Sequence, residues 1–200
     1  MAKNKIGSLL ILLLCLLYGA SGQPVLEEYP MLHKTMALRY DLIKVAESQV
    51  GVREKTGKND GKEVRMYLRE TGLTEGYAWC AAFVTWCHNQ MNIPNPESAW
   101  SPDWFRSNVV YRRNHIRIKP YESRGGEVIG LYYDNLKRVG HVGIIVQEHK
   151  LHYITVEGNT GGDGGREGDG VYRKIRRKEN IHVIADYAGY HEIKEAMKQK

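Results

Sequence analysis

The spacing of apolar residues changes near Gly126, and this change constrains the fold of the 200-residue chain more than any other feature. Before Gly126, apolar residues recur every three or four positions, which is the period of an amphipathic helix. After it, apolar and polar residues alternate, which is the period of a half-buried strand. Helices followed by strands predict an α+β domain, with N-terminal helices packed on a C-terminal antiparallel sheet.

Four helices are expected before Gly126. The first is an amphipathic segment over 35–50 that ends at Gly51, and the second is a short helix over 62–69. The third begins at Cys80. A fourth, over 101–111, would have Ser101 as its N-cap and a proline at its first position. Inward positions are Val64, Tyr67 and Leu68 on the second helix and Cys80, Phe83, Val84, Cys87 and Met91 on one face of the third.

About five strands are expected after Gly126. They span 127–133, 141–147, 151–157, 171–176 and 181–187. Between the two halves lie Trp100, Trp104 and Phe105, which we expect to pack beneath a loop rather than to form a sugar-binding platform.

The first 22 residues have the composition of a secretory signal peptide. Two lysines precede an apolar run that is too short to span a bilayer, and small residues before Gln23 provide a cleavage site. An uncleaved anchor is the alternative, which the short run argues against. Because Leu14 precedes Cys15, lipid attachment at Cys15 is not expected. We therefore expect export to the periplasm or the extracellular space, with no stable membrane insertion after cleavage.

The formal net charge of +6 suits contact with an anionic cell surface. The one dense basic run, 173–178, falls on an expected strand, and a solvated face of that strand explains it better than a nucleic-acid site does. No nucleic-acid partner is expected.

Cys80 and Cys87 are expected to be free thiols. They lie seven positions apart on one predicted helix, which separates their Cα atoms by about 10 Å, and a disulfide tolerates at most roughly 7 Å. Cys87 is interpreted as a buried structural residue. Cys80, in the first turn, lies in the partial positive charge of the helix N-terminus, which favours its thiolate.

No metal or other cofactor is expected. Cys80, Cys87 and His88 lack the two close ligand pairs of a zinc site. Asp163 and Asp169, in the glycine-rich loop 158–170, lack regular calcium-ligand spacing.

The strands over 141–147 and 151–157 read as the arms of a hairpin. If residues 148–150 form its loop, His141 lies directly opposite Glu157, close enough for an imidazole–carboxylate hydrogen bond. A loop of two or four residues would put the two side chains on opposite faces. Asn159 lies two positions after Glu157, so the alternation of a strand places its side chain on the same face as Glu157.

A cysteine at a helix start, a histidine and an acid are the components of a thiol acyl-transfer site. Cys80 would attack an amide carbonyl as thiolate, His141 would protonate the leaving amine, and Glu157 would orient the imidazole. The backbone N–H of Cys80 would donate to the oxyanion, and Tyr77 is a candidate for the second donor. Other histidines compete on residue type alone: His88, His115, His149, His152 and His182.

Three segments, 79–84, 140–145 and 156–160, resemble in this order the CHAP domain, the cysteine, histidine-dependent amidohydrolase/peptidase of papain-like bacterial and phage cell-wall hydrolases. The resemblance covers roughly 36–188 and implies a papain-like fold. It implies Cys80 as nucleophile, His141 as base and Glu157 as third member, with Asn159 as a further polar residue. Glu127 departs from the aspartate that the family usually carries there.

The resemblance leads us to expect a peptidoglycan hydrolase, either an N-acetylmuramoyl-L-alanine amidase or a peptidoglycan endopeptidase. We expect it to be exported and to act as a monomer without a cofactor. A general papain-like cysteine protease and a catalytically silent wall-binding module are alternatives, although a silent module would be expected to have lost one of the three residues. The expected organisation is a signal peptide over 1–22, a leader over 23–35, a CHAP-like catalytic domain over 36–190 and a tail over 191–200.

Overall fold

The computed structural model describes residues 28–114, 121–161 and 168–189. The chain divides into two units, Met1–Ala37 and Leu38–Lys200. The described part of the first unit is the beginning of helix α2 (Glu28–Ser48), and the second unit holds all the other described elements. The predicted signal peptide and the tail after residue 190 lie outside the described residues. Within the described residues, no helix combines the length and the apolar character needed to cross a membrane.

The second predicted helix is confirmed, and the first is longer than predicted. Helix α3 (Lys62–Arg69) buries Val64, Tyr67 and Leu68. Helix α2 begins at Glu28 instead of residue 35. The proline at position 30 is compatible with this longer helix because it lies in the first turn, where its missing backbone N–H would have no helical partner. It ends at Ser48, and Gly51 then takes a left-handed conformation with φ of 101°.

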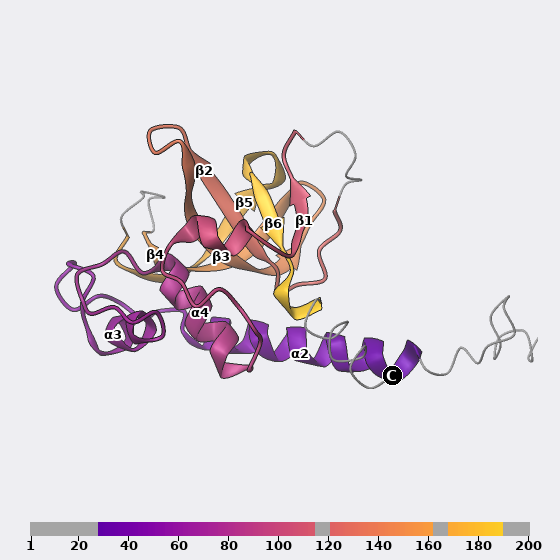
Figure 1. The fold of residues 1–200 in the computed structure, drawn as a ribbon, viewed down its shortest axis with the longest axis horizontal. Helices are drawn as coiled ribbons and strands as arrows, with labels where there is room; N and C mark the ends of the chain where they lie inside the picture. The colour runs from indigo at the N-terminus through magenta and orange to yellow at the C-terminus, as the bar shows by residue number, and fades with distance from the viewer. Residues whose placement is uncertain (1–27, 115–120, 162–167, 190–200) are drawn as a thin grey trace, which may run out of the picture. The chain divides into compact units, whose positions relative to one another are not determined.

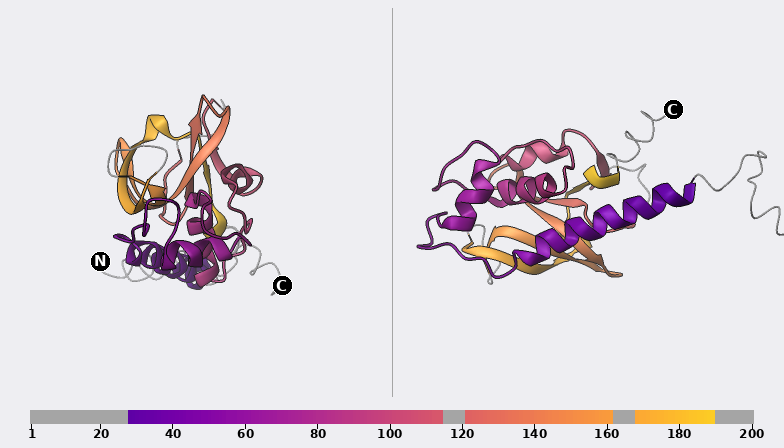
Figure 2. Two further views of the ribbon diagram at one scale, coloured as in Figure 1. Left: turned by 90° about the vertical axis from the view of Figure 1, so that its left-hand side faces the viewer. Right: turned by 90° about the horizontal axis from the view of Figure 1, so that it is seen from below.

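Helix α4 (Cys80–Gln90) begins at Cys80 as predicted, but its burial differs from the prediction. Every residue from Cys80 to His88 is buried, instead of one face alone, because α4 packs against α3 and against two strands of the sheet. Figures 1 and 2 show α3 and α4 gathered on one side of the sheet. Gly158 permits this close packing, since a Cβ there would lie 2.7 Å from the Phe83 Cβ.

The predicted helix over 101–111 is wrong. Residues Ser101–Phe105 form a short 3-10 helix, η2, whose N-cap is Trp100. Asn108 then adopts a positive φ of 58°, which ends helical geometry and turns the chain into strand β1 (Val109–Arg112). Trp104 and Phe105 are buried as expected, whereas Trp100 is 49 % exposed.

Across the described residues, six antiparallel strands form one sheet in the order β1-β6-β2-β3-β4-β5 (Figure 1). Five of them correspond to the five predicted segments, and only β1 was not predicted. The helices-then-sheet architecture confirms the α+β class. The remaining strands are β2 (Val128–Tyr133), β3 (Arg138–Glu148), β4 (His152–Thr160), β5 (Gly170–Arg177) and β6 (Val183–Ala185).

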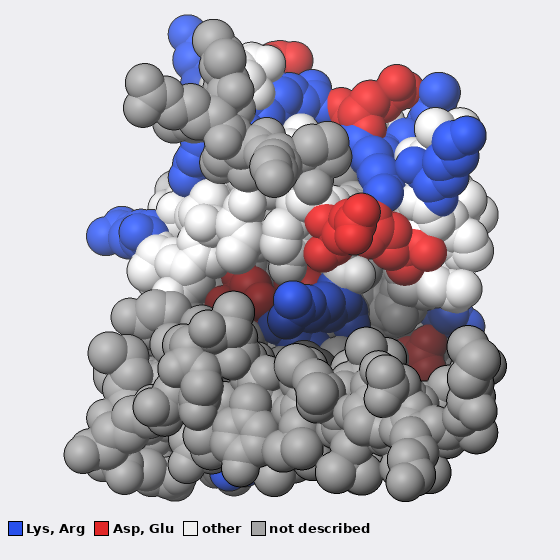
Figure 3. Space-filling model, turned by 90° about the vertical axis from the view of Figure 1, so that its right-hand side faces the viewer, with Lys and Arg blue, Asp and Glu red and all other residues white. Residues whose placement is uncertain are grey.

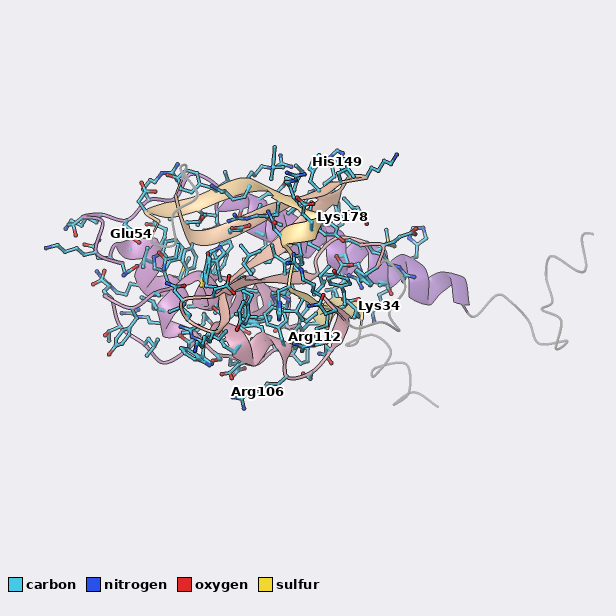
Figure 4. The ribbon with its side chains drawn as sticks, turned by 90° about the horizontal axis from the view of Figure 1, so that it is seen from above. Lys34, Glu54, Arg106, Arg112, His149 and Lys178 are labelled. Atoms are coloured by element: carbon cyan, nitrogen blue, oxygen red, sulfur yellow. The ribbon has the colours of Figure 1, made fainter. Side chains whose placement is uncertain are left out.

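The hairpin of β3 and β4 has a tighter turn than predicted. The His149 N–H donates to the His152 carbonyl at 2.8 Å, so two residues instead of three form the loop. His149 at this turn is labelled in Figure 4. Between Ile145 and Gln147 the register shifts by one residue, which places a β-bulge in β3.

The basic run on β5 pairs with acidic side chains. Arg173 pairs with Glu47 at 3.2 Å, and Lys178, directly after β5, pairs with Glu148. On the face shown in Figure 3, several of the described basic side chains lie next to acidic ones. The run therefore includes partnered residues at the surface, and one of its members, Arg176, points to a buried acid.

Candidate active site

Cys80 is the first residue of α4, and the residue before it is firmly held. The Trp79 indole N–H donates to Glu54 Oε1 at 2.8 Å, and Glu54 is labelled on its loop in Figure 4. The Trp79 carbonyl accepts the first helical bond, from Phe83 N, at 2.8 Å. These contacts place the Cys80 thiol at the helix N-terminus, where it is 6 % exposed.

The Cys80 sulfur shares hydrogen bonds with two side chains. Its Sγ lies 3.5 Å from Ser101 Oγ, which is buried at the start of η2. The imidazole of His141 also hydrogen-bonds to the thiol. Because His141 uses Nε2 for Glu157, Nδ1 is the nitrogen left for the sulfur.

Glu157 is fully buried and accepts hydrogen bonds from three side chains. Its Oε2 lies 2.8 Å from His141 Nε2. Thr155 Oγ1 donates to Oε1 at 2.5 Å. Arg176 donates to both oxygens, from Nε at 2.8 Å and from Nη2 at 2.5 Å. The carboxylate is therefore bonded to a charged guanidinium as well as to the imidazole.

The β-bulge in β3 brings His141 and Glu157 to one face of the sheet. With the observed two-residue turn and no bulge, the two side chains would lie on opposite faces. Beyond the bulge Ile144 pairs with Val156, so the continued register places Glu157 across from Gly143. The prediction that His141 lies directly opposite Glu157 is wrong: the two are diagonal neighbours.

Gly143 makes that diagonal contact possible. A Cβ at this position would overlap Cγ of Glu157. The glycine leaves the space through which the Glu157 side chain reaches His141.

The electrostatics of the site favour a thiolate–imidazolium pair. Burial alone would raise the pKa of Cys80. The hydrogen bond and the charge of His141 oppose this effect, and the pKa lies below its ordinary value. Burial lowers the pKa of His141, whereas its bonds to Cys80 and Glu157 raise it to about 9. Burial also raises the pKa of Glu157, and Arg176 and His141 bring it well below its ordinary value. At neutral pH the imidazole of His141 and the carboxylate of Glu157 are therefore charged, and the lowered pKa of Cys80 favours its thiolate.

Asn159 contacts the backbone of the nucleophile's neighbour. With the amide turned so that each atom faces its complement, its oxygen accepts from Trp79 N at 3.0 Å and its nitrogen donates to the Gly168 carbonyl at 2.9 Å. Asn159 is buried at a positive φ of 51°. It therefore ties the end of β4 to the start of α4, and it makes no hydrogen bond to His141 in this arrangement.

A pocket of about 120 Å³ opens at the thiol. A larger hollow of about 520 Å³ lies beside α3, but no cysteine or histidine lines it. Tyr77, the sequence candidate for an oxyanion donor, is 55 % exposed and does not line the thiol pocket. The pocket is lined by Asn59, Ala78, Cys80, Ala99, Trp100, Ser101, Arg138, Gly140, His141 and Asn159.

Sequence reasoning missed Ser101, Thr155 and Arg176. Arg176 belongs to the basic run, and the only signal for its role was that this run lies on the strand after that of Glu157. Thr155 was visible as the same-face neighbour of Glu157, two positions earlier. Nothing in the sequence linked Ser101 to Cys80, because they come together only through the packing of η2 against α4.

The competing thiol and histidines lie elsewhere. Cys87 is buried, and burial raises its pKa well above the ordinary value. His88 is buried with Nδ1 2.8 Å from the Val84 carbonyl, and burial lowers its pKa to about 4. His149 and His152 stack on each other at the hairpin turn. His182 lies against the Tyr132 ring, and His115 lies outside the described residues.

Comparison with known proteins gives one match. The family model of the CHAP domain matches residues 72–159. The matched segment contains Cys80, His141, Glu157 and Asn159. No curated protein and no solved structure matches the chain.

Proposed function

Because the family model of the CHAP domain matches residues 72–159, we propose that the protein is an exported peptidoglycan hydrolase that cleaves an amide bond of the wall peptide. The family is that of cysteine, histidine-dependent amidohydrolases and peptidases. The observation that carries the proposal is that Cys80 and His141 meet at one pocket, with Glu157 hydrogen-bonded to His141 behind them and with electrostatics that favour a thiolate–imidazolium pair.

In the proposed first step, the Cys80 thiolate attacks the amide carbonyl carbon. The backbone N–H of Cys80, at the N-terminus of α4, donates to the oxyanion. The imidazolium of His141 then gives its proton to the leaving amine as the C–N bond breaks, which leaves a thioester on Cys80.

In the second step, water hydrolyses the thioester. Neutral His141 removes a proton from the attacking water, and the C–S bond breaks to release the carboxylic acid and the thiolate. The imidazole, having accepted that proton, is again the imidazolium. Glu157 stays ionised throughout and stabilises the imidazolium, as a buried carboxylate does for other nucleophile–histidine pairs.

Substitution of the nucleophile tests the proposal. We expect Cys80→Ala to lower the rate of wall hydrolysis by more than about 10⁴-fold, because no other group can form the thioester. Release of new amino groups from purified peptidoglycan measures the rate, and circular dichroism checks the fold. Cys87→Ala is the matched control: it removes a buried thiol from the same helix and should keep the hydrolase activity. Unchanged turnover in Cys80→Ala would disprove the thiol mechanism.

Mass spectrometry of the digested wall identifies the bond. New amine ends without new reducing sugars are expected, and cleavage at the lactyl amide separates an amidase from an endopeptidase. New reducing ends would indicate a glycosidase and contradict the proposal. Comparable cleavage of an unfolded protein would instead favour a general cysteine protease.

Export is a further part of the proposal. It rests on the composition of residues 1–22, two lysines before a short apolar run and small residues at its end. Edman sequencing of the protein recovered outside the cytoplasm should begin at Gln23. Recovery of the full-length chain inside the cell alone would contradict it.

A further inference from the structure

Arg138 is a cationic side chain held at the rim of the thiol pocket. It is the first residue of β3 and lines the pocket together with Cys80 and His141. Its guanidinium carbon lies 3.8 Å from the centroid of the Trp100 ring. Stacking of this kind restrains the planar group in one orientation.

Most of the hydrogen-bond donors of Arg138 are available. One N–H, on Nη1, donates to the Val139 carbonyl at 2.9 Å. An arginine has five N–H donors. Within the described residues, Arg138 forms no ion pair: no aspartate or glutamate oxygen lies within 4.0 Å of its guanidinium nitrogens. Arg176, also near the site, differs because it is paired with Glu157.

The charged side chains that line the pocket carry a net positive charge. The described lining contains Arg138 and the thiolate–imidazolium pair of Cys80 and His141, and no acidic residue. Asn59, Ser101 and Asn159 supply neutral polar groups. An anionic group that enters this pocket would therefore meet an unpaired guanidinium and no repelling carboxylate.

We infer that Arg138, held on Trp100, forms a carboxylate-binding subsite beside Cys80. This inference rests on the proposed function, and it specifies the substrate: a wall peptide that carries a free carboxylate near the scissile amide. A carboxylate matches the planar fork of a guanidinium and can accept two parallel N–H bonds. Because the pocket is only about 120 Å³, a group seated on Arg138 lies close to a carbonyl at Cys80.

The role of the subsite is to choose and orient the substrate. Arg138 does not take part in bond making or breaking. Binding of the carboxylate would hold the neighbouring amide against the thiolate, and an amidated peptide would lose this contact. Arg138 therefore lets the enzyme distinguish wall peptides with a free carboxylate from wall peptides whose carboxylate is amidated.

Two forms of one wall test this selectivity. One half of a peptidoglycan preparation is left with its carboxylates, and the other half is converted to carboxamides with a carbodiimide and ammonium ions. We expect wild-type protein to hydrolyse the amidated wall about tenfold more slowly, the size of one charge-assisted contact. Arg138→Gln should be about tenfold slower on the native wall and should show no further loss on the amidated wall.

Arg106→Gln is the matched control for net charge. Arg106 is exposed, projects away from the ribbon in Figure 4 and does not line the pocket. This variant should keep the wild-type preference, because it changes total charge without changing the subsite. If Arg138→Gln keeps the full wild-type preference, the subsite is disproved while the hydrolase function stands.

Alkylation of Cys80 tests the subsite without any wall substrate. Iodoacetate and iodoacetamide have nearly the same shape, and only iodoacetate carries a carboxylate. We expect the ratio of their rates at Cys80, followed by peptide mass spectrometry, to fall about fivefold in Arg138→Gln, since a nearby cation attracts the anionic reagent. The ratio should be unchanged in Arg106→Gln. An unchanged ratio in Arg138→Gln would overturn the inference, whether or not the protein hydrolyses peptidoglycan.

Discussion

The carboxylate of Glu157 is shared by two cationic side chains, and this sharing sets how strongly it raises the pKa of His141. His141 and Arg176 both bond to its oxygens. A carboxylate that faced His141 alone would raise the pKa of the imidazole, whereas the guanidinium offsets part of that charge. Arg176 therefore limits how strongly Glu157 holds the proton on His141. Arg176 does not contact the sulfur, and we regard it as a positioning residue.

These charges predict a pH window for activity. The pKa of Cys80 lies below its ordinary value, so kcat/KM should rise as the pH passes through this lowered value and the thiolate forms. The pKa of His141 is about 9, so activity should fall as the pH rises through about 9 and the proton donor is lost. Rates of wall hydrolysis between pH 5 and 10 measure both limbs. An alkaline limb at the ordinary histidine value would contradict this account.

Substitutions of Glu157 and of its second cationic partner, Arg176, should move the alkaline limb in opposite directions. Glu157→Gln removes the negative charge beside the imidazole, so the limb should move down by about one pH unit or more. Arg176→Gln removes the competing cation, so the limb should move up. The pH dependence of Cys80 alkylation by iodoacetamide reports the shift independently of the substrate. Shifts of the same sign would show that Arg176 has only a structural role.

At the scale of elements, the β3–β4 hairpin determines whether the site can form. Its turn alone would separate His141 from Glu157, and the bulge between Ile145 and Gln147 restores the alignment of the two side chains. The α4 helix supplies the thiol from the other side, and Gly158 lets it approach the sheet. The site therefore depends on two irregular features, a bulge and a close helix–sheet contact.

Gly143→Ala tests the space that the hairpin keeps open. A methyl group there overlaps the Glu157 side chain, so the carboxylate should move away from His141. We expect activity to fall by about 10²-fold, in the range of a displaced catalytic contact, and the alkaline limb of the pH profile to move down. Thermal unfolding checks stability. Full activity with an unchanged pH profile would show that Glu157 has another route to the imidazole.

At the scale of the whole molecule, one buried arginine joins distant parts of the second unit. Arg39, on α2, donates to the Gly125 carbonyl at 2.8 Å and to Asp186 at 2.5 Å. It also lies 3.4 Å from Glu127, which is fully buried. Glu127 occupies the position where the sequence departed from the usual aspartate of the family, and its carboxylate lies within ion-pair distance of Arg39.

Loss of this arginine should destabilise the fold more than loss of a surface arginine. Arg39→Met leaves Glu127 buried without its cation, and we expect a loss of about 3–5 kcal/mol in the free energy of unfolding. Arg173→Met removes the half-exposed pair with Glu47 and should cost about 0–1 kcal/mol. Urea unfolding of both variants measures the difference. Equal midpoints would show that the Arg39 network does not stabilise the fold.

The local sequence determined much of this protein. Periodicity placed α3 at its bounds, started α4 at Cys80 and located five of the six strands. These features depend on neighbours along the chain, which a sequence displays directly. Cys80, His141 and Glu157 could be named for the same reason, since each stands at a recognisable point in its element and the motifs resemble those of one family.

Only the tertiary structure decided how those residues meet. The bulge in β3, the contact of Ser101 with Cys80 and the pairing of Arg176 with Glu157 join segments whose approach no local pattern encodes. The direct opposition of His141 and Glu157 was predicted wrongly because one extra residue in a strand is invisible to a count of alternating positions. Chain neighbours set the secondary structure, whereas packing and strand register, which sum many weak long-range contacts, set the geometry of the site.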